Sequence, residues 1–216
     1  MPTQEHLQQH IEQLEKRLVQ LEDIEQIKRL QRMYGYYIDN RLWTEMTELF
    51  SDSEAVMEIG QRGRYIGKQH IEDFLVEVLG QGRSGLLRDE FINHMQLQGV
   101  VTLTDNGQHA QGRWRALIQG NPPAGNHSLF WAEGVYENTY VKEAGVWKIA
   151  RLWWVPTFYT THPCDSLAFT SAPASDSLPP QQSSAEPDPA LGRTFVPYHY
   201  PHPITGEAIT RVTSKP

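Results

Sequence analysis

The stretch HMQLQGVVTLTDNGQHAQGRWRALIQ, residues 94–119, predicts two long β-strands joined by a tight turn. Asp105-Asn106-Gly107 is a strong hairpin signal, because asparagine and glycine tolerate the positive φ angles that a two-residue turn requires. The flanking runs, His94–Leu103 and His109–Gln119, both have a strand-like composition. An antiparallel hairpin is therefore expected at the centre of the chain.

The pattern extends this hairpin into a larger sheet. Two more strand-like runs follow it, Leu129–Val141 and Val146–Val155, and residues 54–60 suggest a shorter strand before it. Apolar spacing predicts helices in the part of the chain that precedes the hairpin, over residues 23–39, 40–50 and 68–79. Helices first and a strongly bent antiparallel sheet afterwards indicate an α+β fold.

The N-terminus carries a coiled-coil pattern. Its apolar residues recur at spacings of four, three, four and three, and these residues are Leu7, Ile11, Leu14, Leu18 and Leu21. Because Ile24 comes one position early, two helical segments are expected, an arm over residues 1–22 and a domain helix from Asp23 to Asp39. The arm is too short to be stable alone in water. It packs either on a second copy or across its own domain, and a homodimer is the default expectation.

The C-terminal part differs in composition. Residues 171–192 are rich in Ser, Pro, Ala, Gln and Asp and predict a flexible linker between the domain, residues 23–170, and the segment 193–216. That last segment is rich in aromatic residues and proline. It is expected to dock in extended form on its own domain or on a neighbour.

Composition narrows the range of functions. The net charge of −7 argues against a nucleic-acid partner, and no apolar run suggests a membrane span or a signal peptide. The single cysteine, Cys164, excludes an intramolecular disulfide, which favours a cytoplasmic protein. No metal-ligand motif, phosphate loop or dinucleotide fingerprint is present, so neither a metal nor a cofactor is expected.

Three segments together resemble a known family. They are Tyr36–Trp43 continuing to Leu49-Phe50, then Asn93–Gln98 with its strand and turn, and lastly Tyr136, Tyr140 and the run Gly145–Arg151. In this order and spacing, residues 23–158 resemble the SnoaL-like branch of the nuclear-transport-factor-2-like superfamily. The resemblance implies a cone, in which a curved mixed or antiparallel sheet wraps around helices and leaves a deep pocket. That family contains dehydratases, cyclases, isomerases and non-catalytic modules, so the fold leaves the function open.

The same resemblance singles out Asp39 and His94. In scytalone dehydratase-like members an aspartate at the first position holds a catalytic histidine at the second. A carboxylate that fixes one imidazole nitrogen lets the other nitrogen transfer a proton near neutral pH. Without the resemblance, Asp39 would be a helix-junction cap and His94 a core histidine.

Further candidates surround this pair. Glu133 stands where the dehydratases have a second histidine, and it is either an acid or base with a raised pKa or an outward-facing strand residue. Tyr37 is a candidate catalytic hydroxyl. Arg113 and Arg115 share one face of a strand and bind an anionic or phenolic oxygen if that face is concave. The candidates for substrate contact by an aromatic ring are Tyr36, Trp131, Tyr136, Trp153 and Tyr159.

The leading hypothesis is therefore a cofactor-independent lyase for a hydroxylated aromatic small molecule. Its reaction would be a dehydration, or a C–C cleavage that releases a small carbonyl compound such as formaldehyde, as in SnoaL-like lyases of lignin-derived diarylpropanes. An isomerase or cyclase for a polyketide- or steroid-like substrate would use the same base. The third alternative is a non-catalytic ligand-binding or assembly module.

Overall fold

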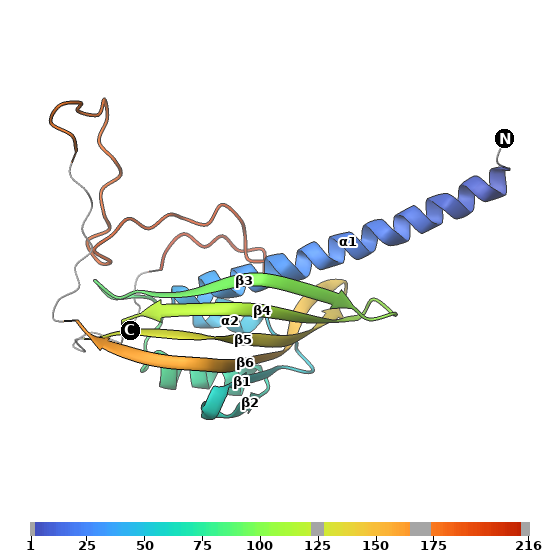
Figure 1. Ribbon diagram of the computed structural model, residues 1–216, viewed down its shortest axis with the longest axis horizontal. Helices are drawn as coiled ribbons and strands as arrows, with labels where there is room; N and C mark the ends of the chain where they lie inside the picture. The colour runs from blue at the N-terminus through green and yellow to red at the C-terminus, as the bar shows by residue number, and fades with distance from the viewer. Residues whose placement is uncertain (1–2, 122–127, 165–173, 213–216) are drawn as a thin grey trace.

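A computed structural model describes residues 3–121, 128–164 and 174–212. Helices cover one face of a single curved sheet, and no helix of the described residues lies on the other face (Figure 1). In chain order the elements are α1 (Gln4–Asp39), α2 (Trp43–Glu48), β1 (Val56–Ile59), the 3₁₀ turn η1 (Gly60–Arg62), β2 (Arg64–Ile66), α3 (Lys68–Asp73), the π-helical turn η2 (Phe74–Leu79), β3 (Ile92–Leu103), β4 (His109–Gly120), β5 (Ser128–Glu143) and β6 (Val146–Pro163).

The sheet has six strands in the order β2-β1-β6-β5-β4-β3. Only β1 and β6 are parallel, and all other neighbours are antiparallel. The predicted hairpin of β3 and β4 is confirmed, with Leu103 opposite Ala110 next to the Asp105-Asn106-Gly107 turn. The α+β class and the cone-like arrangement around helices are also confirmed.

The expectation of two separate N-terminal helices is wrong, because α1 is one continuous helix. The Thr3 hydroxyl caps it by accepting a hydrogen bond from the backbone N–H of His6, and no proline or glycine interrupts residues 4–34. The early Ile24 only shifts the apolar stripe around the helix. Residues 3–22 are all exposed, and Asp23 is the first buried residue that the structure describes. The first half of α1 therefore extends away from the sheet (Figure 1).

Buried polar contacts fix the second half of α1 to the sheet. The Gln31 side chain is fully buried, and its Oε1 accepts hydrogen bonds from Tyr140 at 2.8 Å and from Asn138 at 2.9 Å. Farther along, Gly35 crosses β3 so closely that a Cβ there would lie 3.2 Å from the carbonyl oxygen of His94. This contact places the C-terminal end of α1 directly over the start of β3.

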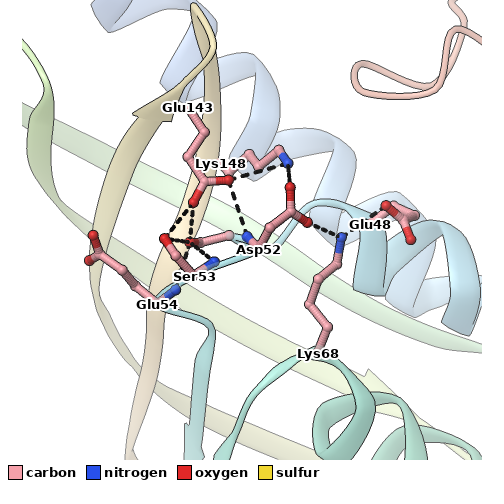
Figure 2. A network of polar contacts seen from close by, with 8 residues as sticks. Glu48, Asp52, Ser53, Glu54, Lys68, Glu143 and Lys148 are labelled. Atoms are coloured by element: carbon pink, nitrogen blue, oxygen red, sulfur yellow. Dashed lines mark hydrogen bonds and ion pairs between the residues drawn. The ribbon is translucent and has the colours of Figure 1, made fainter.

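A second polar cluster ties the β5–β6 turn to the loop before β1 (Figure 2). The Lys148 Nζ lies 3.3 Å from a carboxylate oxygen of Glu143 and also contacts Asp52, whose other oxygen accepts a 2.9 Å bond from Lys68. The Ser51 hydroxyl donates to Glu143 at 2.5 Å. None of these residues lines the cavity described below, so the cluster holds the sheet and not the site.

The C-terminal segment docks on its own domain, which was one of the two predicted arrangements. Leu191, Ile209 and Val212 are buried, and the backbone N–H of Leu86 donates to the carbonyl of Val212. Of the predicted linker, residues 171–173 lie outside the described residues, and residues 174–187 are exposed. The linker boundary at residue 192 stays a prediction, although Leu191 already belongs to the packed part.

None of the helices in the described part of the chain is long and apolar enough to span a membrane.

Candidate functional site

A cavity of about 610 Å³ lies between the concave face of the sheet and the helices. This volume falls in the usual range for small-molecule sites. The cavity is mainly apolar, with walls that include Ile38, Ile118, Phe130, Ala132 and Trp154. Among the described residues, the lining contains two arginines and no aspartate or glutamate, so the formal charges that line the cavity are positive although the whole chain is acidic.

His94 lies at the wall of this cavity and is held by Asp39. The Oδ1 atom of Asp39 accepts one hydrogen bond from the backbone N–H of His94 at 2.6 Å and a second from its Nδ1 at 2.9 Å. Because a carboxylate only accepts, the imidazole proton lies on Nδ1 and leaves the Nε2 lone pair available. The expected pairing of these two residues is therefore present, next to a cavity.

Burial acts on the same pair. It raises the pKa of Asp39 above its usual value, and the hydrogen bonds from His94 oppose that shift. His94 itself is 9% exposed, so the pair is mostly shielded from bulk water. A proton transfer at Nε2 would therefore take place in a medium in which charge interactions are strong.

The end of α1 explains how Asp39 reaches this position. The helix ends in a Schellman motif, because the N–H of Leu42 bonds to the carbonyl of Tyr37 and the N–H of Arg41 to that of Ile38. The motif requires a left-handed residue, and Arg41 adopts it with a φ of 52°. Glycine is usual at this position, so a non-glycine residue here is a strained choice that often marks a functional site.

Arg41 was missed in the sequence. Its side chain is buried and lines the cavity, with Nη1 at 3.8 Å from a carboxylate oxygen of Glu90. Burial lowers the pKa of this guanidinium, and Nη1 makes no hydrogen bond to any described residue. The signal in the sequence that could have identified Arg41 is an arginine at the left-handed position of the helix-end motif, where glycine is usual.

Two of the predicted aromatic contacts line the cavity. Tyr136 is buried, and its hydroxyl lies 3.4 Å from that of Tyr34, while burial raises its pKa. Tyr159 is stacked on Phe130, with ring centroids 5.5 Å apart. Both rings are therefore placed to contact a ligand.

The other predicted residues on β4 and β5 face the opposite side of the sheet. Glu133 pairs with Arg115, and Glu137 pairs with Arg113. Hydrogen bonding from Thr157, together with Arg115, lowers the pKa of Glu133, which corrects the expectation of a raised pKa. The idea that Arg113 and Arg115 bind a substrate oxygen on the concave face is likewise wrong. Trp131 also lies outside the cavity, because it alternates with the cavity residue Ala132.

Trp153, Tyr36 and Tyr37 are also outside the cavity lining. Trp153 contacts the guanidinium of Arg151 at 4.5 Å, and its neighbour Trp154 takes the predicted place in the cavity. Tyr37 is fully buried, with its ring 5.4 Å from that of His202 in a parallel stack. Tyr36 is 55% exposed. Both tyrosines contact the C-terminal segment instead of a ligand site.

No group of three or more His, Cys, Asp or Glu side chains in the described ranges 3–121, 128–164 and 174–212 could hold a metal ion. His127, which precedes Glu133 in the sequence and is a further candidate for acid–base chemistry, lies outside these ranges.

Residues 19–152 match the SnoaL-like domain family. One similar solved structure is that of the hexachlorocyclohexane dehydrochlorinase LinA-type3 from Novosphingobium barchaimii LL02. The two structures superpose with a TM-score of 0.59 and 21% sequence identity, over 72% of this chain and 99% of that chain. A scytalone dehydratase-like protein of Novosphingobium aromaticivorans DSM 12444 is similar at a TM-score of 0.55 and 19% identity, covering 65% and 88%. At these identities the two structures support the fold alone.

Proposed function

The chain belongs to the SnoaL-like domain family, and from its cavity and its His94–Asp39 pair we propose that it is a lyase for a small hydroxylated aromatic compound. The observation that supports this most directly is the double hydrogen bond from His94 to Asp39 at the cavity wall. A fixed imidazole next to an apolar cavity is equipped to move a proton between substrate atoms. Such a reaction needs only the protein's own side chains. A single cysteine also fits our proposal of a cytoplasmic protein.

In a dehydration, His94 Nε2 would take a proton from the carbon next to the one that bears the hydroxyl group. The C–H electrons form the new double bond while the C–O bond breaks. The imidazolium then returns its proton to the departing hydroxide, and water leaves. The enzyme ends in its starting protonation state, so one base suffices. The solved structures similar to this chain include proteins named for dehydration and dehydrochlorination, two eliminations of this kind.

In the proposed C–C cleavage, a para-hydroxylated ring loses its benzylic hydroxyl as water and becomes a quinone methide. Removal of the proton from a neighbouring primary alcohol then breaks the C–C bond and releases formaldehyde. The electron pair forms the new C=C bond and restores the aromatic ring as a phenolate. The two-ring substrate of such a reaction suits a cavity of about 610 Å³ with Phe130, Tyr136, Trp154 and Tyr159 in its walls.

Arg41 and Arg62 are the arginines among the described residues that line the cavity. Both routes place negative charge on a substrate oxygen, and the second passes through a phenolate. A guanidinium stabilises such an oxygen by charge and by hydrogen bonding. We assign to these arginines the role that the sequence suggested for Arg113 and Arg115.

One observation favours a second candidate, an isomerase or cyclase. The Tyr136 hydroxyl, in contact with that of Tyr34, could donate to the oxygen of an enolate formed by proton abstraction next to a carbonyl. This reaction would keep the mass of the substrate, whereas the lyase changes it. The third alternative, a non-catalytic module, predicts that Asp39, His94 and Glu133 do not converge on one cavity. His94 and Asp39 meet at the cavity wall, whereas Glu133 pairs with Arg115 on the other face of the sheet, so the three do not converge and this alternative stays open.

The test is product mass on a panel of hydroxylated aromatic monomers and dimers, after treatment with chelator, for three proteins. These are the wild type, His94→Ala and the matched control His109→Ala, whose side chain is 48% exposed and outside the cavity lining. Loss of water or of a carbonyl fragment with wild type and His109→Ala, but not with His94→Ala, is the expected result. Conversion at unchanged mass would favour the isomerase. Equal action by all three proteins would refute the proposed site.

A further inference from the structure

The arm, defined as residues 4–22 of α1, exposes large apolar side chains that no other element in the described part of the chain covers. Leu7, Ile11, Leu14, Leu18 and Leu21 are between 48% and 61% exposed. Figure 1 shows this half of the helix beyond the edge of the sheet. A row of exposed aliphatic side chains along one helix indicates an interaction surface.

The spacing of these residues is that of a coiled coil and not of a core helix. Leu7, Leu14 and Leu21 occupy d positions of consecutive heptads, and Ile11 and Leu18 occupy the a positions. Ile11 is a β-branched residue at an a position, which together with leucine at d favours two strands, while the second a position holds Leu18. At a rise of 1.5 Å per residue the arm is about 28 Å long.

The charged residues at the e and g positions, beside the apolar seam of the arm, favour pairing with an identical arm in the parallel direction. In a parallel pair of identical arms, each g position meets the e position of the next heptad in the other strand. Arg17 would then face Glu22 of the partner subunit, and His10 would face Glu15 of the partner subunit. In the antiparallel pair with full overlap, Arg17 would instead face His10 of the partner subunit, and Glu15 would face Gln8 of the partner subunit. Neither of the two attractive contacts of the parallel pair, Arg17 with Glu22 and His10 with Glu15, forms in that arrangement, so the charges favour the parallel pair.

The base of the arm is anchored firmly to the domain. The Asp23 carboxylate is buried and accepts hydrogen bonds from Lys142 at 2.7 Å and from the Trp147 indole at 2.8 Å. From there α1 continues without a break to Asp39. The direction of the arm is therefore fixed relative to the cavity.

We propose that residues 4–22 form a parallel two-stranded coiled coil with the same residues of a second copy of this chain. The two domains then lie side by side at the C-terminal end of the coiled coil. Pairing covers the five seam residues of each chain and leaves the concave face of both sheets free. This proposal is independent of the reaction that the cavity catalyses.

Site-specific disulfide formation tests the direction of the pair. In a Cys164→Ser background, Leu7→Cys is expected to form a disulfide-linked dimer under mild oxidation, because identical d positions face each other only in a parallel pair. Gln13→Cys, at the outward c position of the same arm, is the control and should remain largely reduced. Equal cross-linking of both variants, or of neither, would overturn the proposal.

Sedimentation of the full chain tests the seam and the charge pattern. Wild type should be dimeric, and Leu14→Glu should be a monomer with an unchanged near-UV circular dichroism spectrum, since every residue of the arm is exposed. Arg17→Glu and Glu22→Arg should each weaken the dimer at least tenfold at low salt, and the double variant should recover most of the loss. A monomeric wild type, or a dimer that persists in Leu14→Glu, would show that the arm does not pair.

Discussion

The two hydrogen bonds from His94 to Asp39 end on the same carboxylate oxygen, Oδ1. One comes from the backbone and one from the imidazole, so Asp39 fixes both the start of β3 and the orientation of the ring. The carboxylate comes from the last residue of α1, and the histidine lies 55 positions farther along the chain. The site therefore exists only when helix and sheet are packed together.

Asp39→Asn should lower kcat by roughly 100-fold or more, because an amide no longer secures the Nδ1 tautomer that leaves Nε2 basic. KM should change little, since the cavity walls remain. Steady-state kinetics on the substrate found with the panel would measure both constants. Asp105→Asn, in the exposed hairpin turn, is the matched control. If Asp39→Asn keeps wild-type kcat with the same fold, Asp39 has no role in orienting His94.

Arg62→Gln should raise KM several-fold for substrates with an ionised phenol while leaving the melting temperature unchanged, because the side chain is exposed at the cavity edge. Arg41→Gln should lower kcat/KM more strongly, and also the melting temperature, because it removes a charge that lies near the buried Glu90. Comparing each phenol with its methyl ether in both variants measures the charge contribution. If kcat/KM falls equally for the phenol and for its methyl ether, the arginine charge does not contribute to substrate binding.

Tyr198→Phe should destabilise the fold by about 1 kcal/mol, because its hydroxyl accepts a 2.7 Å bond from Asn40 and donates a 3.0 Å bond to the carbonyl of Tyr36. These contacts brace the helix end next to Asp39, so kcat should also fall. Urea denaturation measures the free energy of unfolding. Tyr36→Phe is the control, since its hydroxyl makes no hydrogen bond to any residue in the described ranges. An unchanged stability in Tyr198→Phe would mean that the C-terminal segment does not support the site.

Acid should destabilise the protein through the cluster of Figure 2. Lys148 and Lys68 lower the pKa of Asp52 to about 2. Burial alone would raise the pKa of Glu143, but bonds from Ser51, Ser53 and the Asp52 backbone outweigh it and lower the pKa to about 2.

Both folded-state values lie below the ordinary 3.8 and 4.5 of the two carboxyls. The stabilisation is therefore fully present above about pH 4.5 and is lost as the pH falls toward 2. The melting temperature of the wild type should drop across this window. Lys148→Met should show a shallower drop, and Lys16→Met, on the exposed arm, should match wild type. Identical pH profiles for all three proteins would exclude the cluster as the cause.

Much of the fold could be predicted because its signals are local. The Asp105-Asn106-Gly107 turn, the alternation along β4 and the helical spacing of α1 depend on neighbouring residues only. The pairing of Asp39 with His94 was available only through the resemblance to a family. The continuity of α1 at Ile24 was missed because a break in the spacing of apolar residues has two possible causes. Either the helix ends there, or the helix continues and a different side of it packs on the core.

By itself, the sequence determined that Arg113 and Arg115 share one face of a strand, because side chains alternate along any strand. Only the tertiary structure decided that this face is the outer one, since the helices pack on the other. Which side chains of β6 face the cavity was also decided only by the tertiary structure. The pairing register of β6 with β5 shifts between Thr139 and Tyr140 and between Glu133 and Gly134. Each shift inserts one residue and reverses which side chains face inward. That is why Trp154, and not Trp153, lines the cavity, and why local alternation could not identify it.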